Sequence, residues 1–303
     1  MCIMLFRPSI ILFSLLSMLS LLLAPPMAPQ AWAQAAQVEY AQGLSPLDSQ
    51  RPVYELNLDA RLVTDGPEIL RGMVWRVFAN EPGADGKLPA VATARGGPAS
   101  IQLNAGTYLV HAAFGRAGAS KRVIISGEDA TESFILQAGG LELNAETANV
   151  AIQAKHLRFS IFEREQNEDG ERKMIAFNVA PNKIVQLNEG TYHVLSRYGT
   201  INATVRADLE VKAGQVTQAV LQHRGAGISL RLVSRPGGDP IANTAWSVFT
   251  EDGDKVFTSR LVSPFLILAE GAYEAVVRNG DDDYRRTFVV RSGKNARIEV
   301  LLE

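Results

Sequence analysis

One short motif occurs three times along the chain: a leucine, two residues, a glycine, one residue and a tyrosine. The three glycines stand 84 and 81 residues apart, and an aromatic residue precedes each glycine by 31, 31 and 25 residues. The motif residues are Gly106 and Tyr108, Gly190 and Tyr192, and Gly271 and Tyr273, and the preceding aromatics are Trp75, Phe159 and Trp246. A period of this length is too long for a solenoid repeat, so each copy is expected to be a whole domain.

The residues around each motif favour short β-strands. Apolar side chains alternate with other side chains, as at Tyr108, Val110 and Ala112, and this period of two is typical of a strand with one buried face. An Asp-Gly pair lies between the aromatic and the motif in every copy, and such a pair between apolar runs predicts a hairpin. No stretch after the N-terminal segment keeps a helical period. The sequence therefore predicts an all-β protein made of three tandem β-sandwich domains.

The motif itself has a mechanical interpretation. The glycine lets the chain turn sharply into a new strand, and the tyrosine begins that strand with its ring in the core and its hydroxyl near backbone. This arrangement resembles the tyrosine corner of immunoglobulin-like sandwiches. We therefore expect the repeated tyrosines, and the aromatics that precede them, to serve the core rather than a ligand.

The order of landmarks resembles the transthyretin-like sandwich domains called carboxypeptidase regulatory-like or Cna-B-like. The resemblance covers nearly the whole chain after the leader and implies three immunoglobulin-like or transthyretin-like domains of seven strands each. Members of this group mostly serve as spacers, stalks or accessory binding modules of envelope and cell-surface proteins. One enzymatic branch hydrolyses 5-hydroxyisourate and ends in Tyr-Arg-Gly-Ser, whereas this chain ends in Leu302-Glu303. Some Cna-B-like domains form a Lys–Asn crosslink, but no lysine repeats at a comparable place here.

The N-terminal segment is typical of a secretory signal peptide. Arg7 precedes an apolar stretch over 10–24, and Ala31-Trp32-Ala33 offers small residues before a cleavage site. The alternative is an uncleaved membrane anchor. The predicted organisation is a signal peptide over 1–33, a linker over 34–53 and sandwich repeats over 54–139, 140–226 and 227–303. We expect a periplasmic protein that touches the membrane only through its leader.

The composition excludes several kinds of chemistry. The formal net charge is −2, which gives no basic field for nucleic acid. Cys2 is the only cysteine and lies in the predicted leader, so no disulfide, thiolate metal site or cysteine nucleophile is expected in the exported chain. No histidine has a metal-ligand spacing, and no catalytic motif occurs. The predictions are thus no catalytic residue, no cofactor and no metal; residues 281–283, three aspartates, suggest a hairpin tip rather than a calcium loop.

A second aromatic repeats with the first. Phe78, Phe162 and Phe249 each stand three residues after the core aromatic, so alternation directs them to the opposite face of the strand. A repeated aromatic on an outer face is either packed under a hairpin or the neighbouring domain, or part of a partner surface. Any partner surface is expected to include these three positions.

These observations favour an exported, non-enzymatic envelope protein. It would act as a scaffold, spacer or binding module for a protein or polysaccharide of the cell envelope. One alternative is a subunit of a secretion or adhesion assembly that pairs through an exposed edge strand. Another is an enzyme with a site at a domain junction, which would require His156 and His223 to converge in a cleft with carboxylates.

Overall fold

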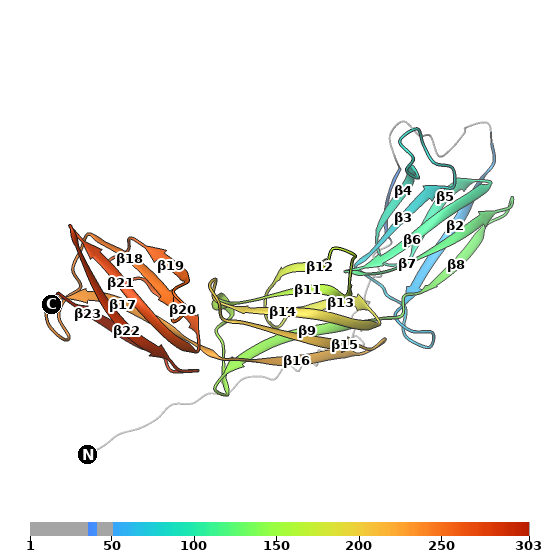
Figure 1. Ribbon diagram of the computed structural model, residues 1–303. Coiled ribbons are helices and arrows are strands. Elements are labelled where there is room, and N and C mark those ends of the chain that lie inside the picture. The colour runs from blue at the N-terminus through green and yellow to red at the C-terminus, as the bar shows by residue number, and fades with distance from the viewer. Residues whose placement is uncertain (1–35, 41–50, 303) are drawn as a thin grey trace, which may run out of the picture. The chain divides into compact units, whose positions relative to one another are not determined.

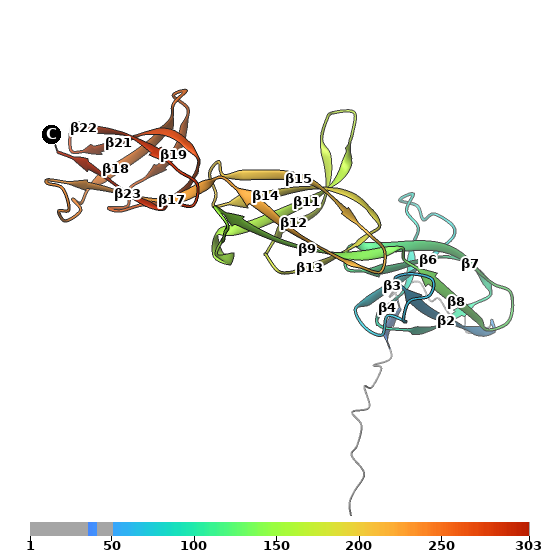
Figure 2. The ribbon, with the colours of Figure 1, turned by 90° about the horizontal axis from the view of Figure 1, so that it is seen from below.

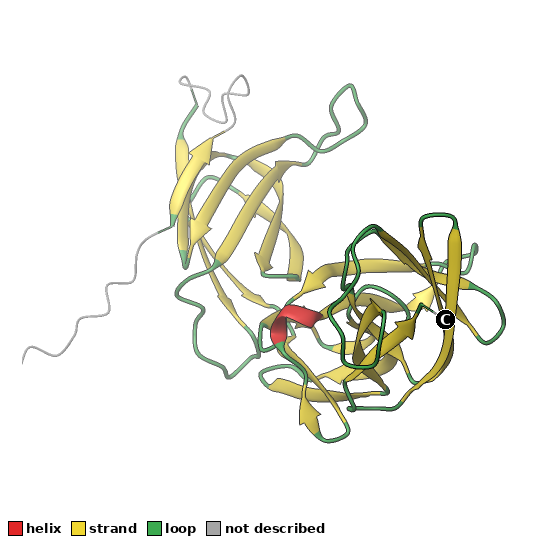
Figure 3. Ribbon diagram, turned by 90° about the vertical axis from the view of Figure 1, so that its left-hand side faces the viewer, coloured by secondary structure: helices red, strands yellow, loops and turns green. Residues whose placement is uncertain are grey.

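The computed structural model describes residues 36–40 and 51–302 (Figure 1), so the predicted leader lies outside the described residues. The predicted fold class is confirmed, because the chain forms three tandem β-sandwiches of seven core strands each. Figure 3 shows strands almost throughout, together with one 3-10 turn, η1 (Ala154–His156). Within the described ranges, no helix has the length and apolar character needed to cross a membrane.

The first sandwich packs a three-stranded sheet on a five-stranded sheet. The small sheet has the order β5-β2-β8 and the large sheet the order β1-β4-β3-β6-β7. The strands are β1 (Gln37–Tyr40), β2 (Val53–Arg61), β3 (Met73–Ala79), β4 (Ala90–Gly96), β5 (Ala99–Asn104), β6 (Gly106–Phe114), β7 (Ala117–Ile125) and β8 (Ala130–Ile135). The segment 34–53, expected as a linker, thus contains β1, which pairs antiparallel with the edge strand β4.

The second sandwich repeats this plan without the added edge strand. Figure 2 shows β9 and β13 in one layer and β11, β12, β14 and β15 in the other. The strands are β9 (Ala138–Thr147), β10 (Val150–Ala151), β11 (Leu157–Gln166), β12 (Arg172–Val179), β13 (Ile184–Asn188), β14 (Gly190–Tyr198), β15 (Thr204–Val211) and β16 (Val216–His223). The short β10 only extends a hairpin from β9, so the core again has seven strands.

The third sandwich has the sheets β20-β17-β23 and β19-β18-β21-β22. Its strands are β17 (Gly225–Val233), β18 (Thr244–Thr250), β19 (Lys255–Ser259), β20 (Phe265–Ala269), β21 (Gly271–Asn279), β22 (Asp282–Val290) and β23 (Ala296–Leu301). Two residues separate β8 from β9, and one residue separates β16 from β17. The domain ends expected at residues 139 and 226 therefore fall inside β9 and β17.

All three sandwiches share one connectivity. In each, the first strand lies at the centre of the small sheet and pairs in parallel with the last strand, as β2 does with β8, β9 with β16 and β17 with β23. All other pairings between strands are antiparallel among the described residues. The large sheet always contains the strand that begins at the motif glycine, in its interior.

The repeated aromatics fill the centres of the three cores. Trp75, Phe159 and Trp246 are each no more than 1% exposed and belong to three separate clusters of buried apolar residues. Burying side chains of this size supplies much of the hydrophobic stabilisation of a small sandwich. The Asp-Gly pairs lie in the hairpins that leave these strands, where Gly86, Gly170 and Gly253 have φ values of 74°, 79° and 86°. Glycine adopts this left-handed conformation at little cost.

Candidate binding faces

The repeated tyrosines form corners. Tyr108, Tyr192 and Tyr273 each donate a hydrogen bond from the hydroxyl to the backbone carbonyl four residues earlier, at 3.0, 2.9 and 3.0 Å. Burial raises the pKa of Tyr108, and burial together with the Glu163 charge raises that of Tyr192. The hydroxyls of Tyr108 and Tyr192 therefore stay protonated, and all three hydroxyls close the turn around the motif glycine, which is a structural role.

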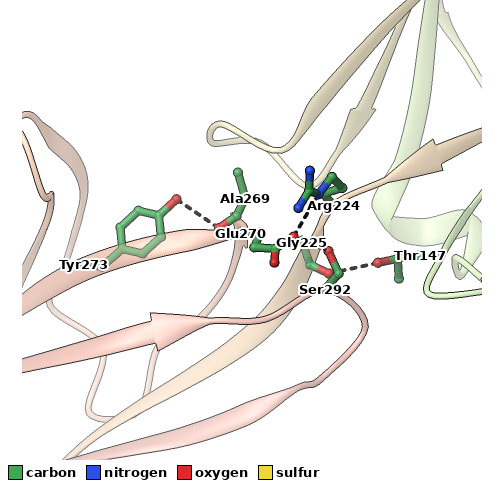
Figure 4. Close-up of polar contacts among 7 residues, drawn as sticks. All are labelled: Thr147, Arg224, Gly225, Ala269, Glu270, Tyr273 and Ser292. Carbon is green, nitrogen blue, oxygen red and sulfur yellow. Dashed lines mark hydrogen bonds and ion pairs between the residues drawn. The ribbon is translucent and has the colours of Figure 1, made fainter.

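The third corner also meets the link from the second sandwich (Figure 4). Arg224, the linking residue, donates from Nε to Glu270 Oε2 at 2.9 Å, and Ser292 Oγ donates to the same oxygen at 2.9 Å. The hydrogen bond from Arg224, with a smaller contribution from that of Ser292, holds the pKa of Glu270 below its usual range. Thr147 Oγ1 donates to the Gly225 carbonyl at 3.0 Å. The Arg224–Glu270 pair therefore joins the linking residue to the corner of the third sandwich.

The three predicted surface phenylalanines lie on the outer faces of the large sheets. Phe78, Phe162 and Phe249 are all half-buried, and none of them is enclosed in the core of its sandwich. The strand partner of Phe78 on β6 is Leu109, and the Phe162 ring lies 6.5 Å from the His193 ring. The structure thus places them on equivalent faces, one in each sandwich, and does not gather them into one cluster.

In the third sandwich, Phe249 contributes to a shallow depression of about 820 Å³ on this outer face. Lys255 Nζ lies 5.4 Å from the centre of the Phe249 ring, a cation–π distance. Arg278 forms a two-pronged ion pair with Asp283, with Nε to Oδ1 at 2.8 Å and a second contact at 3.2 Å. The pair lowers the pKa of Asp283 and raises that of Arg278. The charges of this face therefore largely neutralise one another.

In the second sandwich, Phe162 contributes to a smaller depression of about 180 Å³ on the equivalent face. Its other lining residues are Arg172, His193, Leu195 and Arg206. His193 Nδ1 lies 2.7 Å from Oδ1 of Asp208 on the neighbouring strand, and this hydrogen bond is the main cause that lowers the pKa of Asp208. An apolar floor with arginines at its margin can hold a ligand that has both an apolar side and a negative charge.

The histidines proposed for an enzymatic site have separate surroundings. His223 is 2% exposed inside the second sandwich, with Nε2 2.7 Å from Ser196 Oγ. His156 belongs to η1, and its ring lies 5.7 Å from that of Phe265. No hydrogen bond joins the two histidines within the described part of the chain. Across the same ranges, no group of three or more histidine, cysteine, aspartate or glutamate side chains could hold a metal ion.

The aspartates at 281–283 lie at the tip of the β21–β22 hairpin. Gly280 at this tip has a φ of 64°, as a tight turn requires, and Asp283 is occupied by its pair with Arg278. The geometry is that of a polar hairpin tip.

Comparison with known proteins gives one match to a family model. Residues 227–302, which form the third sandwich, match the family described as the Rhizobiales growth-associated tandem repeat domain. The match covers one repeat, a quarter of the chain. No curated protein matches the sequence.

Several solved structures are similar to this chain. The Bacillus anthracis TIE protein is 17% identical over 83% of this chain and 50% of its own, with a TM-score of 0.23, so this chain spans half the length of that protein. The minor pilin GBS52 of Streptococcus agalactiae is 10% identical over 56% of this chain and 95% of its own, with a TM-score of 0.31. The major pilin subunit BcpA of Bacillus cereus is 10% identical over 83% of this chain and 100% of its own, with a TM-score of 0.23.

The arginines of the second outer face were missed by sequence reasoning. They are scattered between positions 158 and 206, and the net charge of the whole chain hides them. The signal that could have found them is strand alternation: Arg164 follows Phe162 by two residues, and Arg197 follows Leu195 by two, so each pair shares a face.

Proposed function

We propose that this protein is an exported, non-enzymatic scaffold or binding module of the cell envelope. In this proposal it holds a protein or polysaccharide partner on the outer faces of its large sheets. The observation that carries the proposal is the repeated outward phenylalanine, which is half-buried on all three faces and contributes to a depression on two of them. A half-exposed aromatic at the same place in three domains is costly on a purely solvated face, and a partner that covers it would relieve that cost.

The surroundings of the ionisable groups support a non-enzymatic role. The acidic groups at the third corner and on the third outer face are paired with arginines, and His223 is enclosed in a core. General acid–base chemistry needs a group that reaches a substrate with its proton free to move. The family matched by the third sandwich is described as a growth-associated tandem repeat, and a repeated binding module is consistent with that description.

The test is crosslinking of the tagged protein in intact envelopes, followed by capture and mass spectrometry. We expect the partner recovered with the natural chain to fall by about tenfold with a triple variant, F78A/F162A/F249A, because hot-spot aromatics dominate such contacts. The matched control is Phe265→Ala, which removes a 52% exposed aromatic from β20 in the small sheet of the third sandwich. Equal recovery with the natural chain and the triple variant would overturn the role of these faces.

A second candidate is a subunit of a secretion or adhesion assembly. The specific observation is that β1 covers the edge of β4, whereas the equivalent edges of β12 and β19 carry no strand within the described ranges. An open edge offers unpaired backbone groups to an incoming strand. Hydrogen exchange of residues 172–179 and 255–259 in purified envelopes would show protection if a partner strand adds there.

Two finer assignments belong to the same proposal. The shared connectivity of the sandwiches supports membership of the transthyretin-like, carboxypeptidase regulatory-like group, with domains near 54–139, 140–226 and 227–303. The predicted leader over 1–33 supports a periplasmic location after cleavage near Ala33. N-terminal sequencing of the protein recovered from a periplasmic fraction tests the second assignment directly.

A further inference from the structure

The outer face of the large sheet in the second sandwich is rich in arginine. Strand alternation and the lining of the depression identify the side chains that point outward from β11, β12, β14 and β15. These outward side chains include five arginines but only two carboxylates. The arginines are Arg158, Arg164, Arg172, Arg197 and Arg206, and the carboxylates are Asp208 and Glu210. This local excess of positive charge contrasts with the net charge of −2 of the whole chain. The face is therefore suited to an anionic partner.

Comparison with the third sandwich shows which arginine is available. Arg206 lies opposite Leu195, and Arg285 lies opposite Val276 at the same register of the third sandwich. Arg285 Nη1 is 3.5 Å from a carboxylate oxygen of Glu274, which is three residues after the motif glycine. His193 stands at that position in the second sandwich, and its ring is engaged with Asp208. Arg206 consequently makes no ion pair or side-chain hydrogen bond among the residues that the structure describes.

The groups around Arg206 define the shape of a ligand. Phe162 and Leu195 form an apolar floor, and Arg172 lines the same depression of about 180 Å³. The Nε of Arg172 is used in a hydrogen bond to the Arg164 carbonyl at 3.0 Å, which fixes its side chain along the face. Beyond the depression, Arg197 lies over the exposed ring of Phe177 at 5.4 Å. Apolar surface and guanidinium groups thus alternate across the face.

The two strands beneath the depression have both of their edges paired within the sheet. β11 lies between β12 and β14, and β14 lies between β11 and β15, so a ligand over Phe162 and Leu195 meets side chains only. A peptide bound over the depression could not pair its backbone with β11 or β14, and pairing at the edge of β12 would place it beside the depression rather than on it. A sugar ring can pack its C–H face on Phe162, direct a carboxylate to a guanidinium fork and keep its hydroxyls in water.

We propose that the outer face of the second sandwich binds a carboxylate-bearing polysaccharide, with Phe162 and Leu195 under a sugar ring and Arg206 on its carboxylate. This inference rests on the proposed function and names the ligand class for one of its three faces. It distinguishes the second sandwich, where Arg206 has no ion-pair partner within the described ranges, from the third, where the equivalent Arg285 lies 3.5 Å from Glu274.

The experiment is calorimetric titration of the protein, purified from an exporting expression host, with polygalacturonate at low salt. We expect saturable binding that weakens as sodium chloride is added, and no binding of neutral dextran. Arg206→Gln should weaken binding by about tenfold, since a hydrogen-bonded charge pair is lost. Arg285→Gln, the matched control at the equivalent position of the third sandwich, should change binding by less than about twofold. Hydrogen exchange should show protection of β14 and β15 by the polymer.

Several results would overturn the inference. Equal binding of polygalacturonate and dextran would exclude carboxylate recognition, and an equal loss in both arginine variants would exclude the second face as the site. Tighter binding of poly-L-glutamate or of phosphatidylglycerol vesicles would show that the face serves an acidic peptide or a lipid surface instead. If polygalacturonate fails to bind while envelope capture still depends on the three phenylalanines, this inference is wrong and the proposed function stands.

Discussion

Acidification is expected to destabilise the second sandwich through one histidine. His223 is 2% exposed, the Ser196 beside it is fully buried, and Nδ1 of His223 has no hydrogen-bond partner among the described residues. Burial disfavours the charged imidazolium and lowers the pKa of His223 from the ordinary 6.5 to about 4. The folded domain therefore keeps this ring neutral at a pH where the unfolded chain has already taken up a proton.

The sign and size follow from proton linkage. Because the folded pKa lies below the unfolded one, the stability linked to His223 is complete above pH 6.5 and is lost as the pH falls toward 4. The gap between the two values corresponds to about 3 kcal/mol at the acid limit, and about 2 kcal/mol of it is lost by pH 5. Such a loss is a large part of the free energy of unfolding of a domain of this size.

The assay is urea unfolding at pH 7, 6, 5 and 4.5, read by pulsed hydrogen exchange of peptides from β14 and β16. This readout reports on the second sandwich alone in a chain of three domains. The control variant is His223→Gln, which can still hydrogen-bond Ser196 but does not titrate. We expect the natural chain to lose about 2 kcal/mol more than the variant between pH 7 and 5. Parallel stability curves for the two proteins would refute the argument.

Two further substitution pairs test the cores and the turns by the same exchange measurement. Trp75 Nε1 donates to the Gly97 carbonyl at 2.8 Å, whereas Trp246 Nε1 is buried with no partner in the part of the chain that the structure describes. Trp75→Phe should therefore cost its sandwich about 1 kcal/mol more than Trp246→Phe costs its own, and equal losses would contradict this. A Cβ on Gly139 would stand 2.1 Å from a backbone carbonyl oxygen, so Gly139→Ala should lower the free energy of unfolding by more than about 3 kcal/mol. At the unobstructed hairpin position, Gly170→Ala should lower it by only about 1 kcal/mol. A tolerated Gly139→Ala would show that β9 can shift.

The parts of the fold that could be predicted are those set by neighbouring residues. An Asp-Gly pair specifies a hairpin because glycine takes the left-handed conformation cheaply, and Gly86, Gly170 and Gly253 all do so. The alternation of apolar and other side chains along 106–114 predicts which of them face the core, because successive side chains of a strand point to opposite faces. The placement of Trp75 and Phe78 on opposite faces followed from the same rule.

The parts that could not be predicted depend on partners far away in the sequence. The four residues of β1 have no periodicity long enough to recognise, and they form a strand because β4 offers an open edge, with Gln37 opposite Arg95. The arginine-rich face likewise depends on register, since only the pairing of β14 with β15 brings Arg206 beside Leu195. Neither local propensity nor total charge contains that information.

The parallel pairing of the first and last strands has a mechanical consequence. In each sandwich the chain enters at one end of this pair and leaves from the opposite end, as β17 and β23 illustrate with six residues of β17 in register from Ile228 to Val233. Tension applied along the polypeptide would pull the two strands lengthwise past each other, so the backbone hydrogen bonds between them would bear the load together. A sandwich whose first and last strands pair in parallel therefore resists stretching far better than a hairpin, whose hydrogen bonds break one after another.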